Sequence, residues 1–433
     1  MRAMVKKAML VGVTILLIVL GLGGLCGWGG ARMLRSIFNI QYSIFNWEPK
    51  LFKWCFRGLP LVDKIDKLLE DKTYIVLLQN NTELRASGGF MGSYVKLKVQ
   101  SSKLKSVEVE DIYQPDGQLV GYVEPPAPIK QAFPFGSWKL RDSNWDVDFS
   151  VAGEQIAWFL EQGGEHVDGV IAVNLSLVNK MLEILGGVKT VTYNERVTAE
   201  NLRNLAQTYS EVHKEKRDFL GAVGAALFER IKGAKLTEEI KILRLVYDQV
   251  QKGQILVWVK DKDVEQEILE KEWGGGLGNY GGDYLYIVES NLGANKANCC
   301  VTRSVVQLID GDKEKLSIKW ENSSQFPDPK PPVFWGGNYI DYVRVVVPAA
   351  AQIKDAEKYD IETRGRSKIV GFWVTVPAGQ TAAAELVYDL PASNTILVRR
   401  QPGIESFPYK LVVDGKVVVS DTIDRDKEYT WIR

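Results

Sequence analysis

Histidine and cysteine are scarce in this sequence, which has two histidines and four cysteines among 433 residues. His166 and His213 supply little material for a histidine-based metal site or for a Ser-His-Asp triad. No CxxC pair occurs, so a zinc site is not indicated either. Cys299 and Cys300 are adjacent, and adjacent cysteines rarely bond to each other because the disulfide geometry is awkward. We therefore expect no disulfide between them.

A net charge is also lacking, because 54 Lys and Arg residues balance 54 Asp and Glu residues. This balance argues against a nucleic-acid partner and against a disordered acidic protein. The pattern GxxxxGK[ST] is missing, which excludes a P-loop nucleotide site. The length allows two or three domains, and the content of Gly, Trp and Tyr fits a globular, partly β-rich body.

One long apolar run is present near the N-terminus. Residues 8–31 carry no charge and follow Arg2, Lys6 and Lys7. A helix of this length crosses the roughly 30 Å hydrocarbon layer of a bilayer, and the preceding positive charges favour a cytoplasmic N-terminus. We therefore expect residues 1–7 in the cytoplasm and a single-pass anchor in the cell membrane, with most of the chain extracytoplasmic. A cleaved signal peptide is the alternative. Residues 32–71, rich in aromatic and basic residues, form a juxtamembrane stalk in this interpretation.

Residues 72–297 alternate between apolar runs of strand length and amphipathic stretches of helix length. The pattern predicts strands at 74–79, 93–99, 104–113, 167–173, 188–193 and 255–259, and helices at 149–164, 175–185, 199–206, 219–231 and 237–252. Strands that alternate with helices are typical of an α/β domain.

The pattern changes in residues 298–433, where short alternating strands are separated by turn residues. The dipeptide Asp414-Gly415 between two such strands indicates a hairpin. No long helical period is present in this part. We therefore predict a C-terminal all-β, sandwich-like domain, a kind of module that more often binds or spaces than catalyses.

Three polar clusters in the α/β part are candidates for a chemical site. The first lies in LRASGGF and holds Arg85, Ser87, Gly88 and Gly89. Paired glycines at the start of a strand let the backbone approach another group closely or adopt positive φ. They fit either a phosphate-binding turn, with Arg85 aimed at the ligand, or a tight turn without any ligand.

The second cluster is WKLRDSNWDVDF, with Arg141, Asp142, Asn144, Asp146 and Asp148. Its alternative interpretation is structural: Asp148 caps the next helix, and Arg141 with Asp142 is a surface pair. The third cluster is HKEKRDFL, with Lys214 and Arg217. It is also typical of a solvated helix start.

Together the three clusters offer arginines, lysine, carboxylates and backbone amides, which suit a phosphorylated ligand. A carboxylate beside the phosphates could hold a divalent cation. The candidate catalytic residues are Asp142, Asp146 and Asp148, and Asp142 is also the candidate metal ligand.

Several motifs together resemble the membrane-anchored bacterial family called domain of unknown function 4012. They are LLQNNTELRASGGFMGSY, LRDSNWDVDFSVAGEQIAWF, HVDGVIAVNLSLVNKMLEILGGV, KRDFL and YIVESNLGANKAN. The same region is similar, more distantly, to the LytR-CpsA-Psr family. That resemblance implies an N-terminal membrane helix and an extracytoplasmic α/β domain. It also implies transfer of glycopolymers from a polyprenyl-pyrophosphate carrier to peptidoglycan, assisted by Mg²⁺.

The resemblance to the LytR-CpsA-Psr family also implies roles for individual residues. LRDSNW resembles a motif of that family at Arg141 and Asp142, and RASGGF takes the place of another at Arg85 and Ser87. Lys214 and Arg217 stand roughly where a late arginine motif stands. The chain departs from the family where an acidic residue would fall near Asn81 and where an aspartate would fall on Gly88. These departures put the metal-binding part and catalysis in question.

The leading hypothesis is a membrane-anchored envelope protein that binds polyprenyl-pyrophosphate-linked glycopolymers in cell-wall or surface-polysaccharide assembly, with transfer of the polymer as a further, optional activity. Arginines would hold the pyrophosphate, and an aspartate would act as general base toward a sugar hydroxyl. The alternative is a non-catalytic envelope scaffold or adhesion protein with a degenerate α/β domain. A hydrolase is a third option, which requires Asp146 and Asp148 to converge.

Overall fold

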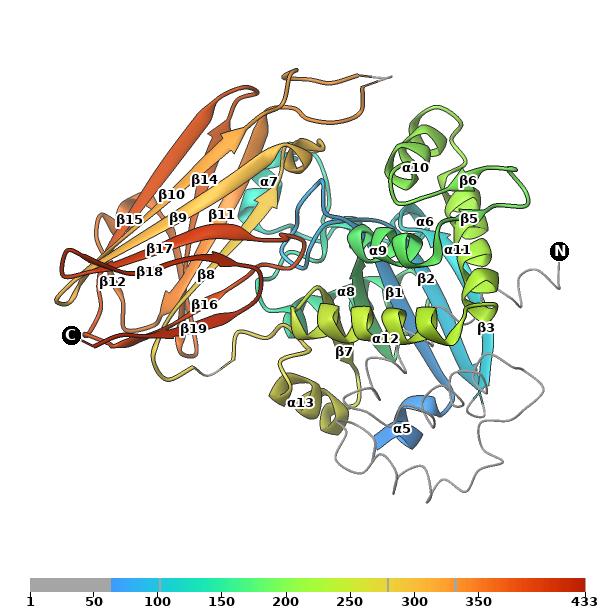
Figure 1. Cartoon of the computed structure of the whole chain (residues 1–433), viewed down its shortest axis with the longest axis horizontal. Helices are drawn as coiled ribbons and strands as arrows, with labels where there is room; N and C mark the ends of the chain where they lie inside the picture. Colours follow the sequence, from blue (N-terminus) through green and yellow to red (C-terminus); the bar gives the residue numbers. More distant parts are fainter. Residues whose placement is uncertain (1–63, 101–102, 279, 331–332, 433) are drawn as a thin grey trace. The chain divides into compact units, whose positions relative to one another are not determined.

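The computed structural model describes residues 64–100, 103–278, 280–330 and 333–432. The expected membrane anchor at 8–31 and nearly all of the expected stalk lie outside these ranges. Within them, no helix is both long and apolar enough to cross a bilayer. The chain forms two compact units (Figure 1). Unit 1 contains residues up to Gln79, Met91–Val120 and Gly153–Gly275, and unit 2 contains Asn80–Phe90, Gly121–Ala152 and Gly276–Arg433.

Unit 1 is built on a five-stranded mixed sheet with the order β3-β2-β1-β4-β7. Its strands are β1 (Lys72–Asn80), β2 (Phe90–Gln100), β3 (Lys103–Asp111), β4 (Gly169–Asn174) and β7 (Ile255–Val259). The central strands β1 and β4 run parallel, whereas β2 with β3 and β4 with β7 are antiparallel. The continuous apolar sequences of β4 and of the edge strand β7 fit their full burial, because a strand covered on both faces needs no polar side.

The helices of unit 1 are α5 (Ile65–Leu69), α6 (Tyr113–Gln118), α8 (Phe149–Gln162), α9 (Leu175–Leu185), α10 (Leu202–Glu211), α11 (Lys216–Lys232), α12 (Leu236–Gln251) and α13 (Lys262–Glu270). Five of them, α8 to α12, correspond to the predicted helices, whereas α5, α6 and α13 were not predicted. Figure 1 shows α9, α11 and α12 in front of the strands. Their buried apolar residues share one core with β1, β4 and β7. Helix α9 ends at Gly186 in the left-handed conformation (φ 73°), which confirms the predicted glycine stop. The predicted strand at 188–193 is shorter, because β5 (Val188–Lys189) pairs only with β6 (Arg196–Val197).

Unit 2 contains two six-stranded sheets. The first, in the order β12-β15-β10-β9-β17-β18, consists of Gln352–Ile353, Thr381–Asp389, Lys313–Asn322, Val301–Asp310, Phe407–Val413 and Lys416–Ile423. The second, in the order β13-β14-β11-β8-β16-β19, consists of Asp360–Arg364, Ser367–Val376, Tyr339–Pro348, Asp283–Asn291, Thr395–Arg399 and Lys427–Thr430. Apolar side chains of both sheets form one core, as a sandwich-like domain requires. Asp414 and Gly415 have φ of 47° and 78° in the β17–β18 turn, which confirms the predicted hairpin.

The contents of unit 2 differ from the single boundary expected at residue 297. Strand β8 is central in a sheet of unit 2, although its sequence was grouped with the α/β part. The segments Asn80–Phe90 and Gly121–Ala152 also belong to unit 2. The second segment carries the short helix α7 (Ala127–Ala132). Periodicity could not reveal this division, because it reports local structure and not the distant segment against which a loop packs.

The expectation for the vicinal cysteines was wrong. Cys299 and Cys300 form a disulfide at the end of the 3₁₀ turn η4 (Ala297–Cys299). Ser323 holds the Cys300 carbonyl oxygen through its N–H (2.8 Å) and its hydroxyl (2.9 Å). Disulfides between adjacent cysteines are rare in general, but here the contacts with Ser323 hold the turn that brings the two thiols together.

Candidate functional site

The LRASGG segment forms a tight turn within unit 2. The Gly88 N–H donates to the Arg85 carbonyl oxygen at 2.9 Å, and the Phe90 N–H donates to that of Glu83 at 2.8 Å. Gly88 has φ of 128°, a conformation that L side chains rarely adopt. The first glycine is therefore required by the backbone of the turn itself.

The second glycine is required by a close backbone approach. A Cβ on Gly89 would lie 2.4 Å from the carbonyl carbon of Asn80 and 2.7 Å from the nitrogen of Asn81. A Cβ on Gly403 would likewise lie 2.0 Å from the Gly88 carbonyl oxygen. The group that passes closest to the paired glycines is thus the chain's own backbone. This contact accounts for both glycines without a ligand, which was one of the two interpretations of the motif.

Arg85 is buried, with an exposed fraction of 2%. Its Nη1 donates to the carbonyl oxygens of Leu84 and Asn291, and its Nη2 donates to Glu83 Oε1 at 3.2 Å and to Asp142 Oδ1 at 3.4 Å. The guanidinium therefore joins the LRASGG turn to a carboxylate of the second motif, 57 residues later. Both terminal nitrogens are occupied by protein oxygens, so direct contact between Arg85 and a ligand stays a prediction.

The second motif is hydrogen-bonded to the first motif through Asn144. This side chain is fully buried, and its amide nitrogen donates to Ser87 Oγ and to the Gly89 carbonyl oxygen, both at 2.9 Å. Arg141 and Asp142 lie in the 3₁₀ turn η3 (Leu140–Asp142), with Arg141 Nε 3.7 Å from Asp142 Oδ2. The Arg141 side chain is 34% exposed, in contrast to Arg85. Arg141 is thus the arginine of the two motifs that reaches solvent.

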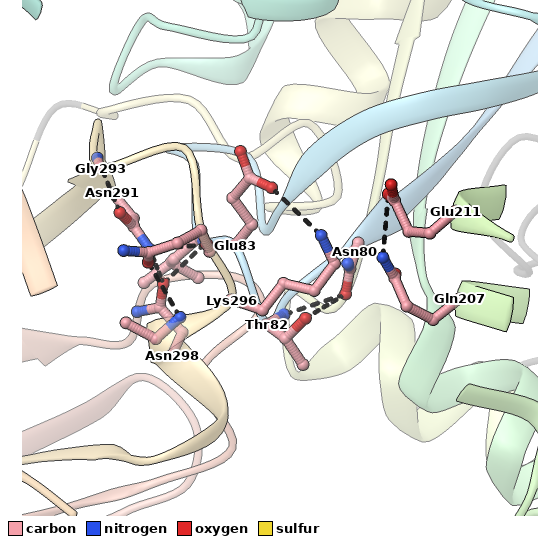
Figure 2. Close-up of polar contacts among 12 residues, drawn as sticks. Asn80, Thr82, Glu83, Gln207, Glu211, Asn291, Gly293, Lys296 and Asn298 are labelled. Atoms are coloured by element: carbon pink, nitrogen blue, oxygen red, sulfur yellow. Dashed lines mark hydrogen bonds and ion pairs between the residues drawn. The ribbon is translucent and has the colours of Figure 1, made fainter. Parts of the chain in front are cut away.

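A third segment, which lies in the family-like motif YIVESNLGANKAN, completes the cluster. Asn298 Oδ1 accepts from the Leu84 N–H (2.9 Å) and from the Asn291 side chain (3.0 Å). Lys296 Nζ lies 4.0 Å from Glu83 Oε2. Figure 2 shows these side chains together with the Asn80–Thr82 contact. The concentration of asparagines in ESNLGANKAN, directly after a strand, was the available signal, because asparagine side chains satisfy irregular backbone.

The cluster is anchored to the polar interior of the two sheets. Gln401 donates to the carbonyl oxygens of Arg85 (3.1 Å) and Glu289 (2.7 Å). The Glu289 carboxylate accepts from Arg303 Nη1 at 2.7 Å and from the Tyr339 hydroxyl at 2.6 Å. Burial, together with the charge of Glu289, raises the pKa of Asp341 well above its ordinary range. The motif segments therefore rest on a buried hydrogen-bonded network, which holds them in one arrangement.

Two predicted catalytic aspartates have other partners. Asp146 Oδ1 pairs with Arg364 Nη1 at 2.7 Å. Asp148 Oδ1 accepts from the N–H (2.9 Å) and the hydroxyl (2.6 Å) of Ser150 at the start of α8, and its Oδ2 accepts from the Leu277 N–H. Asp148 thus makes the helix-capping contacts that the structural interpretation of this residue predicted. Catalytic roles for Asp146 and Asp148 stay predictions.

The third predicted cluster lies in unit 1. Lys214 has φ of 60° just before α11 and lies 3.9 Å from Glu211, and Arg217 lies 3.3 Å from Asp218. Both side chains are well exposed, as expected for a solvated helix start. The structure thus joins the first and second clusters within unit 2, whereas ligand contacts of Lys214 and Arg217 stay predictions.

The charged side chains at the junction of the motifs favour an anion over a cation. Two carboxylates, Glu83 and Asp142, lie among Arg85, Arg141 and Lys296. Both Asp142 oxygens face arginines, and the described residues contain no group of three His, Cys, Asp or Glu side chains that could hold a metal ion. Binding of Mg²⁺ by Asp142 stays a prediction.

Comparisons with known proteins agree with the sequence motifs. A model of the family described as "Protein of unknown function (DUF4012)" matches residues 70–209, which confirms that resemblance for this part of the chain. No curated protein matches the chain. Several solved structures of low sequence identity also match part of the chain.

Three of these solved structures illustrate the extent of the similarity. TagV of Bacillus subtilis is 14% identical over 48% of this chain and 81% of its own, with a TM-score of 0.29. TagT of the same organism is 15% identical over 46% of this chain and 90% of its own, with a TM-score of 0.24. Lin1025 of Listeria innocua is 13% identical over 48% of this chain and 80% of its own, with a TM-score of 0.25. One structure of TagT is described as bound to LIIa-WTA.

Proposed function

We propose that this protein binds a polyprenyl-pyrophosphate-linked glycopolymer during assembly of the cell envelope. The observation that carries the proposal is the joining of two motifs, distant in sequence, into one polar cluster with more cations than carboxylates. The motif resemblance to the LytR-CpsA-Psr family supplies the class of ligand. In this proposal the membrane anchor at 8–31 keeps the binding unit beside the lipid carrier, with peptidoglycan as the neighbouring acceptor.

The residues of the cluster have different roles in this proposal. Arg141 contacts the pyrophosphate, because its guanidinium is partly exposed and its planar fork matches phosphate oxygens. Arg85 is a positioning residue, since it binds Asp142 and Glu83 from a buried site. Ser87, Gly88 and Gly89 shape the turn on which this arrangement depends. Lys296 adds positive charge from the third segment.

The proposal concerns binding, and transfer of the polymer is a separate step. A general base must reach the sugar hydroxyl, and Asp142 is the carboxylate of the cluster with the greater exposure. Its two oxygens are paired with Arg85 and Arg141. Transfer would require Asp142 to exchange one of these partners for the hydroxyl. No step of the proposal runs through Mg²⁺.

A non-catalytic scaffold is the second candidate, and a specific observation favours it. Arg85 and Asn144, two of the most characteristic motif residues, are buried and bonded to other motif residues. Such contacts preserve a fold whether or not a ligand binds. In this alternative the motifs hold the segments Asn80–Phe90 and Gly121–Ala152 in unit 2, and the surface that binds a partner lies elsewhere on the protein.

A binding titration separates the two candidates. The full-length chain is titrated with geranylgeranyl pyrophosphate, with and without Mg²⁺, and geranylgeraniol serves as the uncharged ligand control. Arg141→Ala should weaken binding of the pyrophosphate by about 10- to 100-fold, because it removes a charge-assisted hydrogen bond worth about 1.5–3 kcal/mol.

The matched control is Arg425→Ala in the same unit. Arg425 is also exposed and also pairs with an adjacent aspartate, Asp424, at 3.3 Å. Its loss should leave the affinity for geranylgeranyl pyrophosphate unchanged. If the pyrophosphate and the alcohol bind equally, or if Arg141→Ala has no effect, the glycopolymer proposal fails and the scaffold candidate takes its place.

A further inference from the structure

Unit 2 carries an aromatic cluster next to the motif residues. Tyr342 is buried together with Ile129 and Leu292, and several partly buried aromatic side chains pack around them. These are Phe133, Trp138, Trp145 and Trp373. Three of these side chains are tryptophans, whose large amphipathic rings are left only partly buried here. The proposed pyrophosphate contacts do not use any of these rings.

The rings are held in defined positions. Trp145 and Trp373 both contact Tyr342, with ring centroids 5.7 and 5.3 Å from the Tyr342 ring. Tyr342 lies across Gly371 of the neighbouring strand, where a Cβ would be 2.1 Å from the Tyr342 hydroxyl. The guanidinium of Arg344 stacks on Trp145 at 4.1 Å. Glycine is thus required at position 371 to seat the central ring.

Polar atoms fix the outer edges of the rings. Trp373 Nε1 donates to Gln131 Oε1 at 2.9 Å, and the Tyr342 hydroxyl donates to Asp360 Oδ2 at 2.6 Å. Trp138 Nε1 donates to the Asp142 carbonyl oxygen at 3.2 Å. The aromatic surface is therefore organised before any ligand arrives, which lowers the entropic cost of binding.

The contact between Trp138 and Asp142 places the aromatic surface directly beside the proposed pyrophosphate contacts. In a glycopolymer linked through pyrophosphate, the first sugars lie next to the phosphates. Sugars present flat C–H faces that stack on aromatic rings and a rim of hydroxyls that bond to amides and carboxylates. Gln131 and Asp360 supply an amide and a carboxylate at the edge of this surface. The neighbouring Phe135 is fully exposed and adds a further ring on the same loop.

We infer that Trp138, Trp145 and Trp373 form a saccharide-binding surface that holds the sugar units adjoining the pyrophosphate. The placement of these sugars rests on the proposed function, whereas saccharide binding by the rings does not. A protein partner is the other possible occupant, and the experiment below separates it from a saccharide.

The test is calorimetric titration of the full-length chain with tetra-N-acetylchitotetraose, cellotetraose and maltotetraose. At least one should bind saturably. Trp373→Ala should weaken that binding by about tenfold or more, because a stacked ring is lost, and Trp373→Phe should retain most of it. Phe326→Ala, which removes an exposed aromatic ring elsewhere in unit 2, is the control and should have no effect.

The outcomes distinguish this inference from the proposed function. Trp373→Ala should keep its affinity for geranylgeranyl pyrophosphate, which also shows that the variant is folded. If none of the three saccharides binds, or if Trp373→Ala binds them as tightly as the unmodified chain, the inference is overturned and a protein partner becomes the better occupant. Saccharide binding without pyrophosphate binding would instead overturn the proposed function and retain the saccharide surface.

Discussion

Replacing Arg85 by methionine tests the central claim that this residue joins two motifs rather than binding a ligand alone. Methionine keeps much of the side-chain volume and removes the charge. Glu83 would then lose its nearer cationic partner, at 3.2 Å, and keep Lys296 at 4.0 Å, whereas Asp142 would lose one partner at 3.4 Å. Glu83 is almost completely buried, so water cannot replace the lost partner well. Removing one member of a buried ion pair costs about 3–5 kcal/mol. The lower end of this range is expected here, because Asp142 retains Arg141.

The assay is hydrogen exchange, because two units need not unfold in one step. The amide protons of Phe90, Gly88 and Asn291 report on the turn, since they donate to the carbonyl oxygens of Glu83, Arg85 and Leu84. A loss of about 3 kcal/mol corresponds to exchange faster by about two powers of ten at these amides. Peptides from β4 and β7 in unit 1 should be unaffected.

Arg425→Met is the matched control for this experiment. Its guanidinium is well exposed beside Asp424, and exposed pairs contribute about 0–1 kcal/mol. Exchange in the turn should be unchanged in this variant. If Arg85→Met alters exchange at these amides less than threefold, the guanidinium does not hold the motifs together, and Arg85 returns to its predicted role as a ligand residue.

Two further predictions concern the same unit. Gly89→Ala should cost about 1–3 kcal/mol of stability, because the new Cβ meets the Asn80 backbone at 2.4 Å. Gly281→Ala in the same unit, with no heavy atom within 4 Å of its Cβ, should be tolerated, and equal denaturation midpoints for the two variants would contradict the close approach. Asp341→Asn should raise the melting temperature more at pH 8 than at pH 4. Burial and the charge of Glu289 raise the folded-state pKa of Asp341. The contribution of Asp341 to folding stability is therefore fully present below its unfolded-state pKa of about 4 and is lost as the pH rises, because the folded protein resists ionisation of this carboxyl. Asparagine cannot ionise and avoids this loss. Scanning calorimetry at both pH values measures this, and a shift independent of pH would exclude the proposed titration.

Local patterns in the sequence predicted much of the fold correctly. The apolar runs that became β1, β4 and β7, the glycine stop after α9 and the Asp414-Gly415 hairpin were all identified, because each depends on residues close together in the chain. The change from alternating helices and strands to short strands alone was also correct. The membership of β8 was missed, because a buried apolar strand looks alike in an α/β sheet and in a sandwich-like domain.

The motifs of the candidate site were identified from sequence, but the roles of their residues were not. Arg85 and Arg141 have the same side chain and both belong to family motifs. One is buried between carboxylates and the other reaches solvent. Residue type determines which bonds a side chain is able to make, whereas its neighbours in space determine which bonds it does make. Asn298 and Gln401 support the LRASGG turn from positions more than 200 residues away, and no local pattern indicated this.

The sequence by itself determined the strands β1, β4 and β7, the helices α8 to α12, the Asp414-Gly415 hairpin and the need for glycine in the LRASGG turn. These features follow from short-range sterics and from periodicity along the chain. Only the tertiary structure decided that the segments Asn80–Phe90 and Gly121–Ala152 belong with the β-rich unit, that the vicinal cysteines bond, and that Trp138 lies against Asp142. These features depend on contacts between distant segments, whose free energy comes from burial and hydrogen bonding in the folded chain.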